Sequence, residues 1–211
     1  MPKNNLTKWF ITAGVSLVLA GSYLTLKTFL AGPRPALPPD NAFPVATRIA
    51  DEHPLPSFRL TRDHGEFTEA NLSGKWTFLF FGYTQCPDVC PLTLSAMKRV
   101  MQRLSEQNLA LPQVVFVSVD PRRDTPQLLG EFVPAFDARF IGVTGSDENL
   151  EPLAQALGVK FMRHDGLDKN TYTVDHTAHL YLIAPDRRLK SSFPFPHQEE
   201  FIVREYKQAI Q

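Results

Sequence analysis

Two cysteines, four positions apart, are the residues whose type and spacing point most directly to chemistry. Cys86 and Cys90 stand in the segment CPDVCP, where a run of β-forming residues ends and a helix is expected to begin. Residues four apart on a helical turn have Cα atoms about 6 Å apart, within the roughly 4.4–6.8 Å range of disulfides. The two thiols can therefore bond to each other or share a metal ion. Free amide groups and the helix dipole at such a terminus lower the pKa of a thiol and favour the thiolate that both reactions require.

The pair also has structural interpretations. A disulfide that closes a loop of about five residues stabilises a protein by only about 2 kcal/mol, against about 4.7 kcal/mol for a loop of a hundred residues. A reactive or metal-binding pair is therefore favoured, and two inert buried thiols remain the alternative. Because Pro91 has no amide proton for the carbonyl of Pro87, the regular helix is expected to begin near Pro91.

A metal ion needs further ligands, and histidine is the natural candidate. The chain has six histidines. Four of them fall in linker, turn or polar segments and are expected in solvent: His53, His64, His164 and His197.

The other two histidines precede or enter a buried strand in the segment DHTAHLYLIAP. Strand alternation places His176 on the side of Leu180 and His179 on the opposite side, so the two cannot serve the same site. His176 is the candidate ligand, although a lone histidine is more often a hydrogen-bonded polar side chain.

The segments that must position these residues alternate between strand and helix patterns. Expected strands cover 57–62, a second short strand after the turn at 63–65, 76–83, 114–119, 140–143, 180–184 and 189–193; expected helices include Leu92 to Leu104, one that opens at Thr125-Pro126, 148–157 and one from about Glu199. This order predicts an α/β fold, a mixed sheet with helices on both faces, compatible with a thioredoxin-like fold.

The amino-terminal part predicts a membrane anchor. Trp9 to Leu26 carries no charge over eighteen positions, which as a helix spans about 27 Å, close to the roughly 30 Å hydrocarbon layer. We expect a cytoplasmic tail at 1–8, a transmembrane anchor at 9–31, a proline-rich linker at 32–52 and one folded domain at 53–211. A cleaved signal peptide is the alternative, although its apolar region should be shorter.

Composition limits the classes of protein that remain. The chain has 211 residues and 22 basic against 22 acidic side chains, so its net charge is zero. No basic field of the kind that holds proteins on nucleic acid is present, and we exclude a nucleic-acid binder. A hydrophobic content of 43% is sufficient for a packed core.

Four segments carry a resemblance to a known family. FFGYTQCPDVCPLTL, VSVDPRRDTP, FIGVTGSDENLEPLAQALGV and VDHTAHLYLIAPDRRL resemble, in this order, the SCO/SenC family of membrane-tethered copper-handling proteins of the respiratory chain. In that family the two cysteines of CxxxC and the histidine of the VDH motif bind copper. The resemblance therefore implies that Cys86, Cys90 and His176 are copper ligands.

The resemblance implies a copper chaperone that serves the copper-bearing subunit of cytochrome c oxidase, anchored in a bacterial inner membrane with its domain in the periplasm. Two thiolates and one imidazole suit three-coordinate Cu(I), whereas zinc prefers a fourth ligand, and the oxidation state delivered, Cu(I) or Cu(II), is left open. The alternative is a thiol-disulfide oxidoreductase that uses Cys86 and Cys90 as a redox pair to reduce the oxidase cysteines. The sequence does not match a peroxiredoxin-like peroxidase, because neither cysteine stands in the motif Pro-x-x-x-Thr-x-x-Cys of that class.

Residues at the carboxyl end of the strand 114–119 are candidates to support the site. Asp120, Arg122 and Asp124 follow that strand on the sheet edge where the cysteine loop emerges, so we expect them to orient the site or dock a partner. Turn formation or helix capping is the alternative for Asp124, because Thr125-Pro126 follows. Tyr83 and Asp88 are weaker candidates for groups that support the ligands.

Overall fold

The computed structural model describes residues 47–48, 54–164 and 172–211. They belong to the compact unit Pro44–Gln211, while a second unit, Met1–Phe43, lies outside the described residues. The predicted tail and anchor, and most of the predicted linker, therefore fall outside them as well. Among the helices that are described, none combines the length and apolar character needed to cross a membrane.

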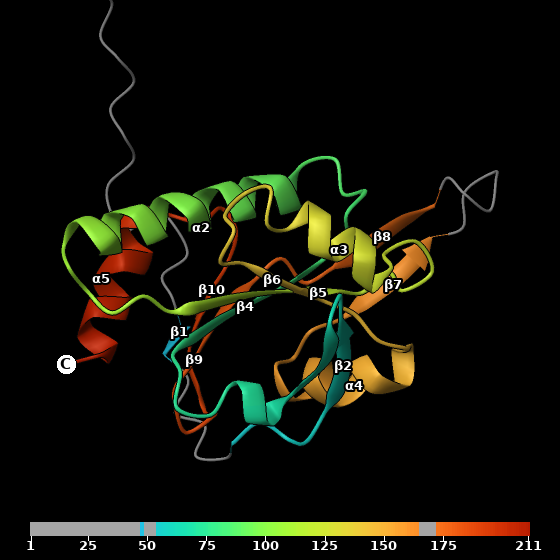
Figure 1. Cartoon of the computed structure of the whole chain (residues 1–211), viewed down its shortest axis with the longest axis horizontal. Helices are drawn as coiled ribbons and strands as arrows, with labels where there is room; N and C mark the ends of the chain where they lie inside the picture. Colours follow the sequence, from blue (N-terminus) through green and yellow to red (C-terminus); the bar gives the residue numbers. More distant parts are fainter. Residues whose placement is uncertain (1–46, 49–53, 165–171) are drawn as a thin grey trace, which may run out of the picture. The chain divides into compact units, whose positions relative to one another are not determined.

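A six-stranded mixed sheet forms the centre of the folded unit (Figure 1). Its strands lie in the order β1-β10-β9-β4-β5-β6, of which β4, β5 and β6 run parallel and the other neighbours antiparallel. Their bounds are β1 Thr47–Arg48, β4 Thr77–Gly82, β5 Gln113–Ser118, β6 Ile141–Val143, β9 Leu180–Ile183 and β10 Leu189–Phe193. The predicted mixed sheet is confirmed.

Side chains of the central strands alternate between two apolar clusters. Phe78 and Phe80 pack with residues of α2 (Val89–Glu106), α3 (Pro126–Phe132) and α5 (Glu199–Ala209). Leu79 and Phe81 pack on the other face with residues of α4 (Asp147–Ala156) and of the hairpin β2 (Arg59–Arg62) and β3 (Gly65–Thr68), which η1 (Glu69–Asn71) follows. Helices thus cover both faces, as the buried apolar run at β4 requires.

The helix that follows the cysteine loop begins two residues earlier than predicted. The helix α2 starts at Val89, so Pro91 lies inside its first turn. The amide groups of the first turn have no partner within the helix in any case, so a proline there removes no hydrogen bond. The other helix signal is confirmed, because Thr125 caps α3 by accepting a hydrogen bond from the amide of Leu128.

The strand predicted at 180–184 is confirmed as β9, but the strand alternation extended back to His176 is wrong. The first part of DHTAHLYLIAP belongs to β8 (Thr173–His176), which pairs with β7 (Phe161–His164) in a separate two-stranded sheet. The chain leaves β8 at Thr177, whose hydroxyl accepts a hydrogen bond from the amide of Lys160 and whose own amide donates to the carbonyl of Lys160. We call the described residues 160–164 and 172–177 the arm.

Candidate metal centre

The cysteine loop leaves the buried end of β4 and enters α2. Gly82, the last residue of β4, allows this close approach: a Cβ there would lie 2.6 Å from the Cys90 sulfur and 2.8 Å from the ring of Phe116. Cys90 itself is fully buried, whereas Cys86 is partly exposed. Neither cysteine forms a disulfide.

A buried carboxylate fixes the turn that precedes Cys86. Asp124 accepts hydrogen bonds from the Thr84 amide at 2.9 Å, the Thr84 hydroxyl at 2.5 Å and the Ser118 hydroxyl at 2.6 Å. Asp124 is completely buried, and three donors to one carboxylate offset the penalty for burying its charge. The expectation that Asp124 orients the site agrees with these contacts, and the helix cap belongs to Thr125 instead.

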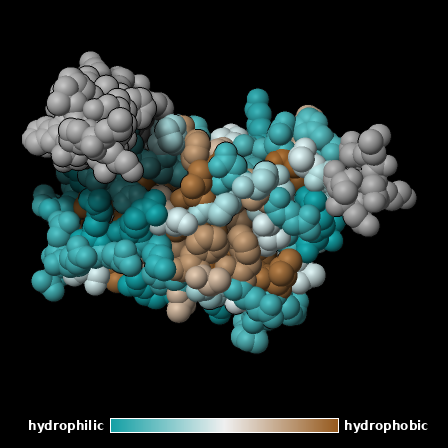
Figure 2. Space-filling view, turned by 90° about the horizontal axis from the view of Figure 1, so that it is seen from above, coloured by the Kyte–Doolittle hydropathy of each residue, from teal (hydrophilic) through white to brown (hydrophobic). Residues whose placement is uncertain are grey.

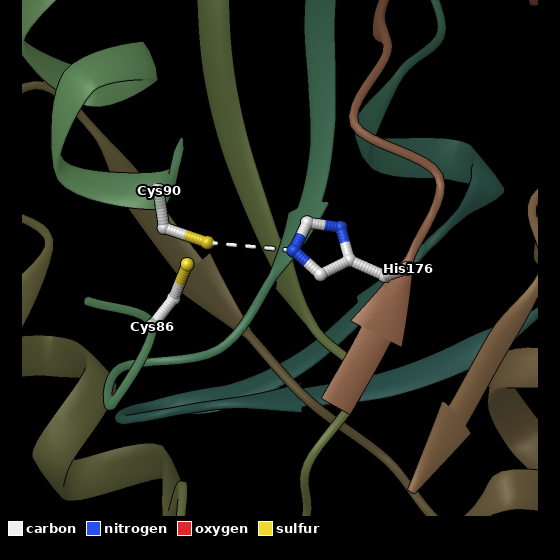
Figure 3. A group of neighbouring side chains, drawn as sticks. All are labelled: Cys86, Cys90 and His176. Carbon is white, nitrogen blue, oxygen red and sulfur yellow. Dashed lines mark hydrogen bonds between the residues drawn. The ribbon is translucent and has the colours of Figure 1, made fainter. Parts of the chain in front are cut away.

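The arm brings His176 to the two sulfur atoms (Figure 3). The Nε2 atom of His176 lies 3.7 Å from the sulfur of Cys90, and the ligand atoms of Cys86, Cys90 and His176 all lie within 4.8 Å of one another. The imidazole packs edge-on against Phe80 and Tyr83, at ring-centroid distances of 6.1 and 6.0 Å. The three predicted ligands are thus brought together from the cysteine loop, α2 and the end of β8.

The two thiols differ in their electrostatic surroundings. The hydrogen bond from the Cys90 thiol lowers the pKa of Cys86 to about 3, helped by His176 and by backbone groups of Asp88 and Cys90, while burial opposes the shift. The same hydrogen bond raises the pKa of Cys90, and burial raises it further. Cys86 is therefore the thiolate of the metal-free pair, and Cys90 holds the proton.

Two other histidines lie where the sequence predicted them. His64 is exposed, and His164 is half exposed and paired with Asp175 at 2.6 Å on the outer side of the arm. His53 lies outside the described residues.

His179 is separated from the sulfur atoms, as predicted, but for a different reason. It directly precedes β9, in another sheet from His176, and its Nδ1 atom lies 2.9 Å from the hydroxyl of Ser192 on β10. The chain direction changes between the two histidines, so strand alternation does not decide their positions.

The prediction that His197 lies in solvent is wrong. Its ring packs edge-on against Phe80 and Phe195, at centroid distances of 6.3 and 5.6 Å, and both ring nitrogens are buried. Burial lowers the pKa of His197 to about 4, with a further contribution from His179, and the Pro194 backbone opposes the shift only in part. The rings of Phe80 on β4 and Phe195 before α5 enclose His197. Its polar neighbours in the sequence had suggested an exposed side chain.

Of the residues that follow β5, some are buried near the metal centre and others are exposed to solvent. Asp120 is buried and binds Arg123, whereas the predicted Arg122 is exposed. Arg123 is the residue that the sequence reasoning missed, since two adjacent arginines look equivalent in the sequence. Tyr83 packs on His176 as expected, but the side chain of Asp88 is exposed and forms no cap of α2.

Two sulfur ligands and one imidazole form a soft, three-donor set. Such a set suits a three-coordinate Cu(I) ion, and the partly exposed Cys86 leaves one side open for exchange. The SCO1/SenC family model matches residues 47–211, which include all three donors.

The chain belongs to the SCO1/SenC family.

Known proteins resemble the chain over most of its folded unit. A protein of Stutzerimonas stutzeri is 38% identical over 146 residues, 69% of this chain and 71% of that protein. The mitochondrial SCO1 homolog 1 of Arabidopsis thaliana is 42% identical over 130 residues, 61% of this chain, and this match spans only 39% of the Arabidopsis protein. The crystal structure of Arabidopsis thaliana ScoI with copper bound matches with a TM-score of 0.68 and 35% identity, over 74% of this chain and 99% of the Arabidopsis one.

Proposed function

We propose that this SCO1/SenC protein binds copper through Cys86, Cys90 and His176 and delivers it for the assembly of cytochrome c oxidase. The observation that carries this proposal is the convergence of two sulfur atoms and one imidazole within 4.8 Å. Copper is the cargo, and the ligand softness favours Cu(I) over zinc at a site with three protein donors. The copper-bound structure of the Arabidopsis relative supports the same choice of metal.

The partner and the location belong to the same proposal. The copper-bearing subunit of the oxidase is the recipient, and the apolar segment at 9–31, charge-free from Trp9 to Leu26, anchors the chain in a bacterial inner membrane with the folded unit in the periplasm. Figure 2 shows apolar surface gathered in the middle of the face above α2 and α3, with hydrophilic surface around it. Leu92, in the first turn of α2 two residues after Cys90, is 51% exposed, which suits contact with a protein partner at the point of transfer.

Metal analysis of the full chain tests the copper proposal. Reduced protein, loaded with Cu(I) under argon and desalted, should retain close to one copper per chain. His176→Ala should lose most of this copper to a Cu(I) chelator, whereas His179→Ala, a matched change three residues later, should retain it. Copper at background level in folded, reduced wild-type protein would contradict the proposal.

A second function is favoured by the difference between the two thiols. A thiolate at Cys86 beside a protonated Cys90 is the arrangement of a reductant: Cys86 attacks the partner's disulfide, and Cys90 then resolves the mixed disulfide. The pair gives up two electrons and the one proton of Cys90 and becomes a disulfide, while the partner's disulfide becomes one thiol and one thiolate, which takes its proton from water.

Cells that carry His176→Ala separate the two functions, because this change removes a metal ligand and leaves both sulfur atoms. If copper delivery is required, these cells should lack oxidase copper and recover in part with added copper. If thiol reduction is required, they should respire normally, while Cys86→Ser cells should not. The cysteine variants alone cannot distinguish the functions, because each abolishes both.

A further inference from the structure

The arm that carries His176 is not a part of the central sheet. Among the residues that the structure describes, the strands β7 and β8 pair only with each other, and His176 stands opposite Phe161 at the end of that pairing. The distance between the imidazole and the sulfur atoms therefore depends on the contacts that dock the arm. We propose that Arg123 is a positioning residue, which holds the arm and so His176 against the cysteine loop; this inference rests on the proposed copper-binding function.

Arg123 contacts the arm and the cysteine loop at the same time. Its Nη1 atom donates to the carbonyl of Tyr172, directly before β8, and to the side-chain carbonyl of Gln85, directly before Cys86, both at 3.0 Å. Its guanidinium carbon lies 3.7 Å from the centroid of the Tyr172 ring. One side chain thus connects the segments that supply the histidine and the first sulfur.

A buried carboxylate holds Arg123 in this place. The Nε atom donates to Asp120 at 2.5 Å, and the side chains of Arg123 and Asp120 are 13% and 0% exposed. Asp120 also accepts a hydrogen bond from the hydroxyl of Tyr172, so the carboxylate grips the arm directly as well. A flat guanidinium can donate in three directions while its face stacks on an aromatic ring, which a lysine cannot do.

Another arginine docks the arm without touching the cysteine loop. Arg163 on β7 donates to the carbonyl of Val119 at 2.8 Å and forms two hydrogen bonds with Asp147. Arg163 therefore fixes the arm to the body of the fold, and Arg123 sets its position relative to the sulfur atoms.

The arm amplifies small movements at Tyr172. His176 lies four strand positions after Tyr172, about 13 Å away, so a tilt of about 5° at Tyr172 moves the imidazole by about 1 Å. Metal ligands must keep their distances within about 0.2 Å. A small loss of positioning at Arg123 therefore removes the histidine as an effective ligand while both thiols remain in place.

The test compares Arg123→Lys with Arg122→Lys, the same change at the exposed neighbouring arginine. Lysine keeps a positive charge beside Asp120, so the fold is retained. In competition with a Cu(I) chelator, Arg123→Lys should bind Cu(I) roughly 10- to 100-fold more weakly than wild type, the range typical of residues that orient metal ligands, and Arg122→Lys should match wild type.

A double-mutant cycle separates positioning from a general effect on the fold. If Arg123 acts through His176, then adding Arg123→Lys to His176→Ala should change the remaining Cu(I) affinity by no more than about twofold. An equal loss in both backgrounds would overturn the proposal. Wild-type protein that binds no copper would instead contradict the proposed function.

Hydrogen exchange in the metal-free protein tests the same inference without copper. Amides of 172–177 should exchange faster in Arg123→Lys than in wild type or Arg122→Lys. Gly74→Ala strains the backbone at a glycine with positive φ, but its added Cβ meets no atom within 4 Å, so it should leave the exchange of these amides unchanged. Wild-type exchange of the arm in Arg123→Lys would show that Arg123 does not hold it.

Discussion

The two halves of the ligand set reach the same point by different physical means. The cysteine half is held by apolar packing: all six residues of β4 are buried, and Cys90 lies in the same cluster as Phe80 and Phe116. The histidine half combines a few apolar contacts with several polar ones. In the arm, Tyr172 and Val174 are buried in the other apolar cluster, but β7 has no fully buried residue, and two arginines with their carboxylate partners supply polar contacts to the fold.

This difference predicts that the cysteine half is rigid and that the arm moves more easily. Close-packed cores resist small displacements, whereas a docked segment with few buried apolar contacts opens at lower free energy than the whole domain. We therefore expect the two sulfur atoms to keep their positions while the imidazole of His176 moves toward and away from them. Such an order would suit the proposed copper delivery, because an ion that loses its imidazole would still be held by two sulfur atoms.

Gly82→Ala should have the largest effect on the cysteine half. The new Cβ would lie 2.6 Å from the Cys90 sulfur and 2.8 Å from Phe116, so packed groups must shift. Overpacking of this kind costs about 3 kcal/mol, which urea unfolding should detect together with weaker Cu(I) binding. Gly74→Ala is the control, since it has only backbone strain of about 1 kcal/mol and should retain copper fully. Wild-type stability of Gly82→Ala would show that close packing does not hold the cysteine half.

Low pH should lower the folding stability of the cysteine half through His197, which packs against Phe80. The unfolded chain takes up a proton at this histidine as the pH falls below about 6.5, but the folded chain does so only at about 4. Folding stability should therefore fall between about pH 6.5 and pH 4, by on the order of 3 kcal/mol. In His197→Leu, urea unfolding should show a shallower loss over this range, and an unchanged slope would show that another group is responsible.

The cysteine half could be predicted from the sequence because its determinants are local. An apolar run that ends in Gly82, followed by CPDVCP and helical spacing, is sufficient to place both thiols at a strand-to-helix junction. Even the error at Pro91 is small, because a proline in the first helical turn displaces no hydrogen bond.

The histidine half could not be predicted in this way. DHTAHLYLIAP has the composition of one strand, and what divides it is a contact between Thr177 and Lys160, seventeen residues apart in sequence. Strand periodicity makes His176 only a candidate, and it is the family resemblance that implies its role as a copper ligand. The choice between Arg122 and Arg123 likewise depends on which one faces Asp120, and the burial of His197 depends on aromatic rings that are distant in sequence.

Tyr172→Phe should make the arm open more often while it leaves the cysteine half unchanged. The change removes the hydroxyl that donates to Asp120 but keeps the ring under Arg123. A loss of about 1 kcal/mol should make the amides of 172–177 exchange about fivefold faster. Gly82→Ala should leave exchange in the arm unchanged if the arm opens separately. Equal acceleration of the arm in both variants would show one cooperative unit and no division into halves.

His179→Ala should have the smallest effect on copper. His179 and His176 are three residues apart in sequence, but His179 bonds to Ser192 on β10 and so belongs to the sheet half. Its removal costs one hydrogen bond, about 1 kcal/mol of unfolding free energy, and should leave Cu(I) affinity within about twofold of wild type. His176→Ala, measured beside it in the same chelator competition, supplies the loss expected of a ligand. A loss of copper in His179→Ala as large as in His176→Ala would mean that the segment between the two strands holds both histidines at the metal, and that the arm does not position His176 alone.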